Sequence, residues 1–532
     1  MASPRSAPGG CMRSKLGLDV GLADSCREVA AEIARDVGKR TAGRTTVSVE
    51  RTIARLLGVD GVDALDVPLP NVLVDQIEEH GGLARGLAYW LGNAIIATGA
   101  EPLEIAKLVG AGELDLHHLP LAEDHRIRQT IRQHAAAALE KIRGTRAERA
   151  TFRAGLDGGT ADAVETYVLT ATGNVYEDVA HAEAVAENGG DIVAVIRSTA
   201  QSLLDYVPFG PTTEGFGGTF ATQANFAIMR EALDRWSRAN GRYVKLSSFC
   251  SGLCMPEIAA MGAIEGLDNM VNDALYGILY RDINLRRTLI DQRFSRMING
   301  YFGVVINTGE DNYLRTADAV TAAPSVVASQ MINYFLARDS GLPPEQIGVG
   351  NAFEIHPDVT NGLLYEWAQA QLTRELFPDC PVKYMPPTVH MNGNPFRTHA
   401  VDSLFNLVTV ATKQEIQTIG VPTEGVFTPH IHDRVLGLEN TRYVANFARD
   451  LGDEIEFRPG GIIQTRAAQV LAEAHQMLLE IAEIGLFDAI GKGYFGNVSR
   501  HYDHGRGAEG IVEFDTGYYN PFMELMGVDL DA

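Results

Sequence analysis

The feature that most constrains the fold is an alternation of short apolar runs with amphipathic helical segments over residues 161–425. Apolar, β-branched runs of about four to eight residues are typical of buried parallel strands. Eight such strands in about 260 residues predict a (β/α)8 TIM barrel. A doubly wound open sheet is the alternative, and we prefer the barrel because polar residues follow every strand rather than one switch point. The predicted strands are 164–171, 192–196, 243–249, 270–275, 303–307, 347–353, 382–385 and 418–421.

The segments between these strands have the 3.6-residue periodicity of helices that cover a sheet. In the segment 219–239, for example, Phe226, Met229 and Leu233 fall on one face. The predicted helices of the barrel are 179–188, 219–239, 256–266, 284–298, 314–338, 360–377 and 398–414.

The chain on either side of the alternation is predicted to be helical. We expect a disordered N-terminus at 1–14, an N-terminal helical accessory region at 15–160, the barrel at 161–425, and a C-terminal helical accessory region at 426–532. The N-terminal region has no convincing strand, and the C-terminal region reads as an accessory layer or a partner-docking surface. The helices expected in the two regions are 22–39, 46–57, 82–98, 123–148, 433–450 and 463–486.

Composition excludes several classes of protein. Apolar residues make up 45% and charged residues 21% of the 532-residue chain, as in ordinary soluble globular proteins. A net charge of −23 argues against a nucleic-acid-binding surface. We expect no secretory signal and no membrane span, and the five cysteines suit reduced thiols in the cytoplasm.

The stretch 191–218 is the first candidate for a ligand site. Arg197 stands where a buried strand should end, and Ser202 follows it before a loop rich in glycine. An arginine, hydroxyl groups and exposed backbone N–H groups at one place can hold an anion such as a phosphate. The alternative is that Arg197 pairs with a carboxylate and the glycines only turn the chain.

Other predicted strands also end in polar side chains, and in a barrel these ends share one face. Together they favour an anionic, zwitterionic small molecule as the ligand. Each residue also has an ordinary interpretation, because Asp311 can cap a helix, Tyr276 can pack in a core, and Lys383 can pair with Glu424. The candidates are Ser251, Tyr276, Arg281, Asp311, Asn312, Lys383 and Glu424.

The sequence predicts no metal site and no nucleotide loop. Cys250 and Cys254 lack the partner cysteines that a zinc site or an iron–sulfur cluster needs, and are expected to be structural thiols. His430 and His432 lack a third ligand nearby, and no Walker or G-x-G-x-x-G loop is apparent.

Long phrases of the sequence resemble one family, that of lysine 5,6-aminomutase α subunits, which act on D-lysine or β-lysine. The resemblance runs from TTVSVERTIARLLGVDG near residue 45 to YYNPFMELMG near the end. The phrases that carry it are VIRSTAQSLLDYVPFGPTTEGFGGTFATQ, CSGLCMPEIAAMGA, NDALYGILYRDIN, INGYFGVVINTGEDNYLRTADA and KYMPPT.

This resemblance implies a radical isomerase that uses pyridoxal 5′-phosphate and adenosylcobalamin. Such an enzyme moves the terminal amino group of lysine or β-lysine from C6 to C5 and gives 2,5- or 3,5-diaminohexanoate in lysine fermentation. The resemblance also implies an α2β2 heterotetramer, in which the β subunit binds cobalamin and supplies the Schiff-base lysine. The only approach to a cobalamin-ligating Asp-x-His-x-x-Gly motif, at 115–120, ends in proline, which agrees with ligation by the partner.

The resemblance further implies roles for the candidate residues. Arg197 and Ser202 should bind the coenzyme phosphate, Tyr276 should lie against the pyridine ring, and Ser251 should face the ring nitrogen. A neutral serine there leaves the ring less electron-withdrawing than an aspartate would, which suits radical chemistry. The substrate or the coenzyme O3′ should be bound by Arg281, Asp311, Asn312, Lys383 and Glu424. An ornithine aminomutase or a non-catalytic scaffold remains the alternative.

Overall fold

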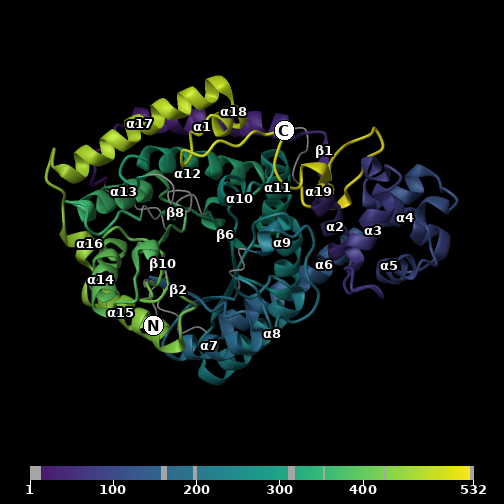
Figure 1. Ribbon diagram of the computed structural model, residues 1–532, viewed down its shortest axis with the longest axis horizontal. Helices are drawn as coiled ribbons and strands as arrows, with labels where there is room; N and C mark the ends of the chain where they lie inside the picture. Colours follow the sequence, from purple (N-terminus) through teal and green to yellow (C-terminus); the bar gives the residue numbers. More distant parts are fainter. Residues whose placement is uncertain are drawn as a thin grey trace.

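The computed structural model describes residues 14–156, 164–195, 200–308, 318–351, 354–424 and 426–527. Its central part is a ring of parallel strands surrounded by helices (Figure 1). The strands of the ring are β2 (Glu165–Leu169), β3 (Ile192–Ala194), β4 (Lys245–Phe249), β5 (Asn269–Val271), β6 (Val305–Asn307), β7 (Ile347–Gly348), β8 (Gly350–Asn351), β9 (Lys383–Tyr384) and β10 (Ile416–Thr418).

Pairing between the first and last strands closes the ring. β2 pairs in parallel with both β3 and β10, and Thr418 lies beside Tyr167 in the latter pair. The seventh strand of the barrel is interrupted at Val349, so that β7 pairs with β6 while β8 pairs with β9. The TIM-barrel prediction is therefore confirmed, and the open sheet is excluded.

All eight predicted strands are present, but the paired segments are shorter than the apolar runs. The last strand is also displaced, because β10 begins two residues and ends three residues before the predicted segment 418–421. Ile419 and Val421 are buried beyond the end of β10. The apolar run therefore indicates which residues are buried, and burial continues past the last residue that pairs with a neighbouring strand.

Helices follow the strands and form the outer layer of the barrel. α15 packs against α14 and α7 and thereby covers β10 and β2. On this packing we propose that the barrel unit extends to residue 447, past the expected boundary at 425. The helices of the outer layer are α7 (Val175–Glu187), α8 (Gln223–Asn240), α9 (Met255–Glu265), α10 (Leu275–Arg281), α11 (Leu285–Tyr301), α12 (Ala323–Asp339), α13 (Gly362–Leu376), α14 (Pro395–Ala411) and α15 (Ile431–Phe447).

The N-terminal part of the chain is helical and includes two helices beyond the predicted ones. α3 and α5 carry a proline in their first turn, where a missing N–H costs no hydrogen bond, so these prolines begin helices. α3, α4 and α5 form a group beside the barrel (Figure 1). The N-terminal helices are α1 (Val20–Thr41), α2 (Val47–Leu56), α3 (Leu69–Glu78), α4 (Leu87–Thr98), α5 (Pro102–Gly110) and α6 (Asp124–Gly155).

The expectation that this region contains no strand is wrong. β1 (Arg44–Thr46) pairs antiparallel with β11 (Ile511–Glu513), which lies near the other end of the chain. Nearby, α19 (Pro521–Leu525) packs on α6. The C-terminal tail is therefore part of the same structure as the N-terminal helices.

A further helical layer lies outside the barrel. α1 packs against both α12 and α17 (Ile462–Ile484). The two long helices α1 and α17 run along one edge of the molecule (Figure 1). The short helices α16 (Leu451–Glu454) and α18 (Leu486–Gly491) flank α17. No helix in the described part of the chain combines the length and apolarity needed to cross a bilayer.

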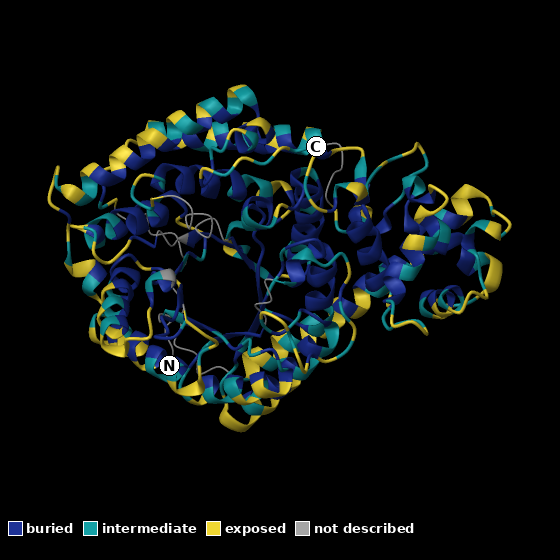
Figure 2. Ribbon diagram, viewed as in Figure 1, coloured by how far each residue is buried: buried dark blue, intermediate teal, exposed yellow. Residues whose placement is uncertain are grey.

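Two apolar regions stabilise the barrel. Large clusters fill the space between strands and helices, and Figure 2 shows buried residues on the inward sides of the helices and exposed ones outside. A small cluster fills the inside of the ring, with Leu169 and Phe249 packed against it as its half-buried members. The buried members of that inner cluster are Tyr167, Ile192, Ala194, Val271 and Ile416.

Asp402 is an ionisable group buried between α14 and the residues after β10. Its Oδ1 atom has no hydrogen-bond partner in the described structure, and a Cβ atom on Gly420 would lie 1.9 Å from it. Burial raises the pKa of Asp402 to about 8. The carboxyl group is therefore mainly protonated in the folded protein at neutral pH.

We predict that Asp402 makes wild-type stability fall with rising pH relative to Asp402→Asn. Because the folded-state pKa is raised, the contribution of Asp402 to the free energy of unfolding is fully present below the unfolded-state pKa of about 4. That contribution is lost as the pH rises to about 8, by at most about 1.4 kcal/mol per pH unit. Thermal midpoints of the two proteins between pH 5 and pH 9 measure this. A difference between them that stays constant over that range would contradict the assignment.

Candidate active site

The carboxyl ends of the barrel strands and the loops that follow them form the candidate site. In TIM-barrel proteins this face carries the ligand, because the inside of the ring is filled by side chains. The sequence-predicted residues within the described chain lie on the strands or on the loops and short helices that directly follow them. Arg197, Asp311 and Asn312 lie outside the described residues.

Ser202 and Ser251 are brought together by a close approach of two loops. The backbone N–H of Leu253 donates to the carbonyl of Ser202 at 3.2 Å. Gly252 has a φ of +86°, and a Cβ atom there would lie 2.4 Å from the Cα atom of Ser202. Only glycine allows this approach, so the sequence CSGLC places two serines on adjoining loops after β3 and β4.

Tyr276 and Arg281 lie on α10, beside the short helix η3 (Gln201–Leu203) that carries Ser202. The Arg281 Nη2 donates to the Tyr276 hydroxyl at 3.1 Å, and the guanidinium carbon lies 5.5 Å from the centre of that ring. The Arg281 Nε is buried and has no hydrogen-bond partner among the described residues. Tyr276 is half-buried, so it is not an ordinary core aromatic.

This side of the mouth, after β3, β4 and β5, fits an anionic ligand with a flat ring. It offers the hydroxyl groups of Ser202 and Ser251, an arginine with an unused donor, and a tyrosine ring held by that arginine. Arginine and hydroxyl donors are well suited to phosphate oxygens, and an aromatic face suits a planar heterocycle. We call this set of four residues the β3–β5 group.

Lys383 and Glu424 lie across the ring from the β3–β5 group, on β9 and just after β10. The Lys383 Nζ lies 4.1 Å from the centre of the Tyr167 ring on β2, so this side chain points into the barrel. Glu424 lies in the turn before α15, and its charge acts on Arg434 of that helix. These two residues can bind an amino group and a carboxylate of a second ligand.

Arg434 fixes the seam between the last and first units of the barrel. Its Nε donates to the carbonyl of Leu169 at 2.6 Å, and its Nη1 lies 2.5 Å from the Nδ1 of His181. Burial, helped by Arg434, lowers the pKa of His181 to about 4, so this imidazole is neutral and accepts the bond. The end of β2 is thereby tied to α15, next to Glu424.

The first histidine of the sequence TPHIHD has a structural use. His430 is the N-cap of α15, and its backbone N–H donates to the Asp433 carboxylate at 3.2 Å. Within the described chain, no three His, Cys, Asp or Glu side chains are placed to hold a metal ion. Cys250 and Cys254 are both buried and free, and burial raises the pKa of each.

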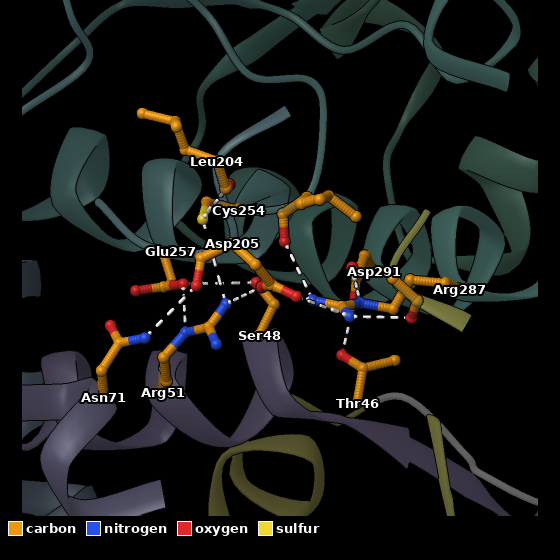
Figure 3. A network of polar contacts seen from close by, with 12 residues as sticks. Thr46, Ser48, Arg51, Asn71, Leu204, Asp205, Cys254, Glu257, Arg287 and Asp291 are labelled. Carbon is orange, nitrogen blue, oxygen red and sulfur yellow. Dashed lines mark hydrogen bonds and ion pairs between the residues drawn. The ribbon is translucent and has the colours of Figure 1, made fainter. Parts of the chain in front are cut away.

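A network of charged residues next to the β3–β5 group was missed by sequence analysis (Figure 3). Its members are buried except for Asp205, which is half-buried. It contains as many arginines as carboxylates and joins α2, α9 and α11 to the loop after β3. No local signal identifies it, because each pair joins residues that are far apart in the sequence, apart from Arg287 with Asp291. Its charged members are Arg51, Arg55, Asp205, Glu257, Arg287 and Asp291.

The geometry of the network is that of paired, hydrogen-bonded charges. Arg51 and Arg55 of α2 each bond Glu257 at 2.8 Å, and Arg51 also bonds Asp205. Arg287 of α11 bonds Asp205 and Asp291 at 2.9 Å each. Buried charges of this kind are tolerated only when each has its partner.

The pKa values of these carboxyls follow from burial and the arginines. Burial acts to raise the pKa of Asp205, but Arg287 and Arg51 outweigh it and lower that pKa below its usual value. Glu257 behaves in the same way, because Arg51 and Arg55 outweigh its burial. Burial raises the pKa of Asp291 to about 6 despite Arg287. Asp205 and Glu257 are therefore ionised at neutral pH.

Comparisons with known proteins agree with this architecture. A family model described as the D-lysine 5,6-aminomutase TIM-barrel domain of the alpha subunit matches residues 16–525. The chain is 52% identical to the lysine 5,6-aminomutase alpha subunit of Acetoanaerobium sticklandii over 97% of its length and 99% of that protein. It is 53% identical to the subunit of the same name from Fusobacterium nucleatum over 96% of its length and 99% of that protein.

A more distant similarity links the chain to a second aminomutase. It is 26% identical to the D-ornithine 4,5-aminomutase subunit beta of Acetoanaerobium sticklandii, over 67% of this chain and 50% of that protein. The two matches to lysine 5,6-aminomutase alpha subunits cover nearly the full chain, and their sequence identity is about twice as high. The chain belongs to the family of lysine 5,6-aminomutase α subunits, which are subunits of isomerases.

Proposed function

We propose that this chain is the pyridoxal-phosphate-binding α subunit of an adenosylcobalamin-dependent lysine 5,6-aminomutase. The reaction is a radical shift of the terminal amino group of D-lysine or L-β-lysine from C6 to C5, which gives 2,5- or 3,5-diaminohexanoate. The observation that carries the proposal is that the β3–β5 group lies on one side of the barrel, while Lys383, which points into the ring, and Glu424 belong to the units across from it. Such a mouth suits a phosphorylated ring on one side and a zwitterionic chain on the other.

The β3–β5 group is proposed to bind the coenzyme. Ser202, with Arg197, would bind the phosphate, because hydroxyl and guanidinium donors match its oxygens. Ser251 would face the ring nitrogen, and Tyr276 would lie against the ring. When bound, pyridoxal phosphate supplies a conjugated system that can carry the migrating nitrogen, and adenosylcobalamin supplies the radical.

The remaining candidates are proposed to bind and orient the substrate. Lys383 would bind the carboxylate, and Glu424 would bind an amino group that does not migrate, by charge complementarity. Arg281, Asp311 and Asn312 would bind the substrate or the coenzyme O3′. The protein's own contribution is then to hold the reacting carbon in place and exclude water, so that the radical is not quenched.

The partner is proposed to be the β subunit of the same enzyme, in an α2β2 assembly in the cytoplasm. It would ligate cobalamin and supply the lysine that holds the coenzyme. Placement of this chain's own lysines supports that division. Of the eight lysines, only Lys245 and Lys383 are on barrel strands, and Lys245 is bound to both oxygens of Glu165 at 2.5 Å.

Comparing substrates tests the proposed function against its alternatives. We expect the chain, combined with its β subunit and both coenzymes, to convert D-lysine or L-β-lysine with a kcat/KM at least about a hundredfold above that for D-ornithine. Mass spectrometry or NMR of the products measures this. A preference for ornithine would identify the alternative aminomutase, and binding without turnover of any diamino acid would support the scaffold alternative.

We predict that Lys383→Met raises KM for the substrate by about tenfold or more and leaves coenzyme affinity unchanged. The loss corresponds to one charge-assisted hydrogen bond between the ammonium and the substrate carboxylate. Lys413→Met is the matched control, because Lys413 is an exposed lysine paired with Asp453. Unchanged KM in Lys383→Met, or equal changes in both variants, would remove Lys383 from the substrate site.

A further inference from the structure

The segment 200–205 that carries Ser202 is tethered on both sides of that serine. The Gln201 amide donates to the carbonyl of Ala221 at 2.9 Å and accepts from its N–H at 2.5 Å. The carbonyl of Leu204 accepts from the Cys254 thiol at 3.3 Å. With the bond from Leu253 to Ser202, three residues of the segment are fixed by contacts outside it.

Asp205 makes the strongest of these tethers. Its Oδ1 and Oδ2 atoms accept from the two terminal nitrogens of Arg287 at 2.9 and 3.2 Å, and Arg51 donates to Oδ1 as well. Its backbone carbonyl accepts from the Asn71 amide of α3 at 3.2 Å (Figure 3). The N-terminal helices therefore contact this loop through both the side chain and the backbone of one residue.

Two arginines on one carboxylate define its position better than one ion pair does. A bidentate guanidinium–carboxylate pair fixes direction as well as distance. The two arginines come from different elements, α2 and α11, and each is held by a second carboxylate, Glu257 or Asp291. Asp205 is thus held by an assembly that does not depend on the loop itself.

Only two residues separate Asp205 from Ser202, so a displacement of Asp205 moves Ser202 with it. Hydrogen bonds to a phosphate weaken steeply when the donor shifts by more than a few tenths of an ångström. Loops are in general more mobile than helices and strands, so a binding group on a loop needs external support to stay in place.

We propose that Asp205 is a positioning residue for the coenzyme phosphate, through which the N-terminal helices control coenzyme affinity. Asp205 does not touch the ligand. It holds the Ser202 loop against α2 and α11, in the geometry that the phosphate requires. This inference rests on the proposed function, specifically on the assignment of Ser202 to the phosphate.

The test compares two probes that differ only in the phosphate, pyridoxal phosphate and pyridoxal. Both share the ring and the aldehyde, so the ratio of their dissociation constants isolates the phosphate contribution. Equilibrium dialysis of the full-length chain gives the ratio for the wild type and for Asp205→Asn, with inorganic phosphate as a competitor. We expect Asp205→Asn to reduce the preference for pyridoxal phosphate by about tenfold and to weaken competition by phosphate equally.

Asp234→Asn is the matched control. Asp234 on α8 is also bound by two arginines, Arg149 at 3.0 Å and Arg230 at 2.8 Å, and it also joins an N-terminal helix to a barrel helix. Within the described part of the chain, Asp234 makes no hydrogen bond or ion pair with the Ser202 loop. We expect Asp234→Asn to lower the thermal midpoint without changing the ratio.

The outcomes separate the inference from the proposed function. If wild type does not prefer pyridoxal phosphate to pyridoxal, both are overturned. If wild type shows the preference and folded Asp205→Asn keeps it in full, or if Asp234→Asn loses it equally, only the inference is overturned. If Asp205→Asn does not fold, Cys254→Ala decides, because it removes the thiol's bond to Leu204 and its contact with Arg51 while Asp205 itself stays in place. A loss of preference of about threefold is expected, and no loss would overturn the inference.

Discussion

The structure depends on a set of charges that are buried together with their partners. Arg51 and Arg55 on α2 meet Glu257 on α9, and Arg51 and Arg287 meet Asp205 in the loop after β3. Removing Glu257 would leave the buried Arg55 without its partner at 2.8 Å, at a cost of several kcal/mol. The N-terminal helix α2 is therefore joined firmly to the barrel, beside the loop after β3, at the face where we propose that ligands bind.

The barrel itself keeps two groups of polar side chains on opposite sides of its ring. An apolar cluster that includes Tyr167 and Ile416 fills the inside of the ring, so ligands are confined to the open face. Ser202 and Arg281 belong to units on one side of that face, and Lys383 and Glu424 to units on the other. A coenzyme and a substrate that must react with each other can thus be bound by separate sets of residues, with the reacting atoms between them.

The sequence predicted the barrel because burial between strands and helices leaves a periodic apolar pattern that is local. It did not predict β1, since a three-residue strand is recognisable only beside its partner β11, at the other end of the chain. The helices α3 and α5 were not predicted, although a proline in the first turn begins each of them. Ser202 and Ser251 were found because they follow predicted strands and because of the family resemblance. Asp205 was missed, because its importance arises from two arginines that only the fold brings to it.

The central claim is that this barrel binds the coenzyme while another chain supplies the lysine that holds it. The most direct measurement is to add pyridoxal phosphate to this chain, alone and with the β subunit, to reduce with borohydride, and to locate the labelled lysine by mass spectrometry. The account predicts a label on a lysine of the β subunit and none on the eight lysines of this chain. Stoichiometric labelling of Lys383 in this chain, with or without the partner, would contradict it.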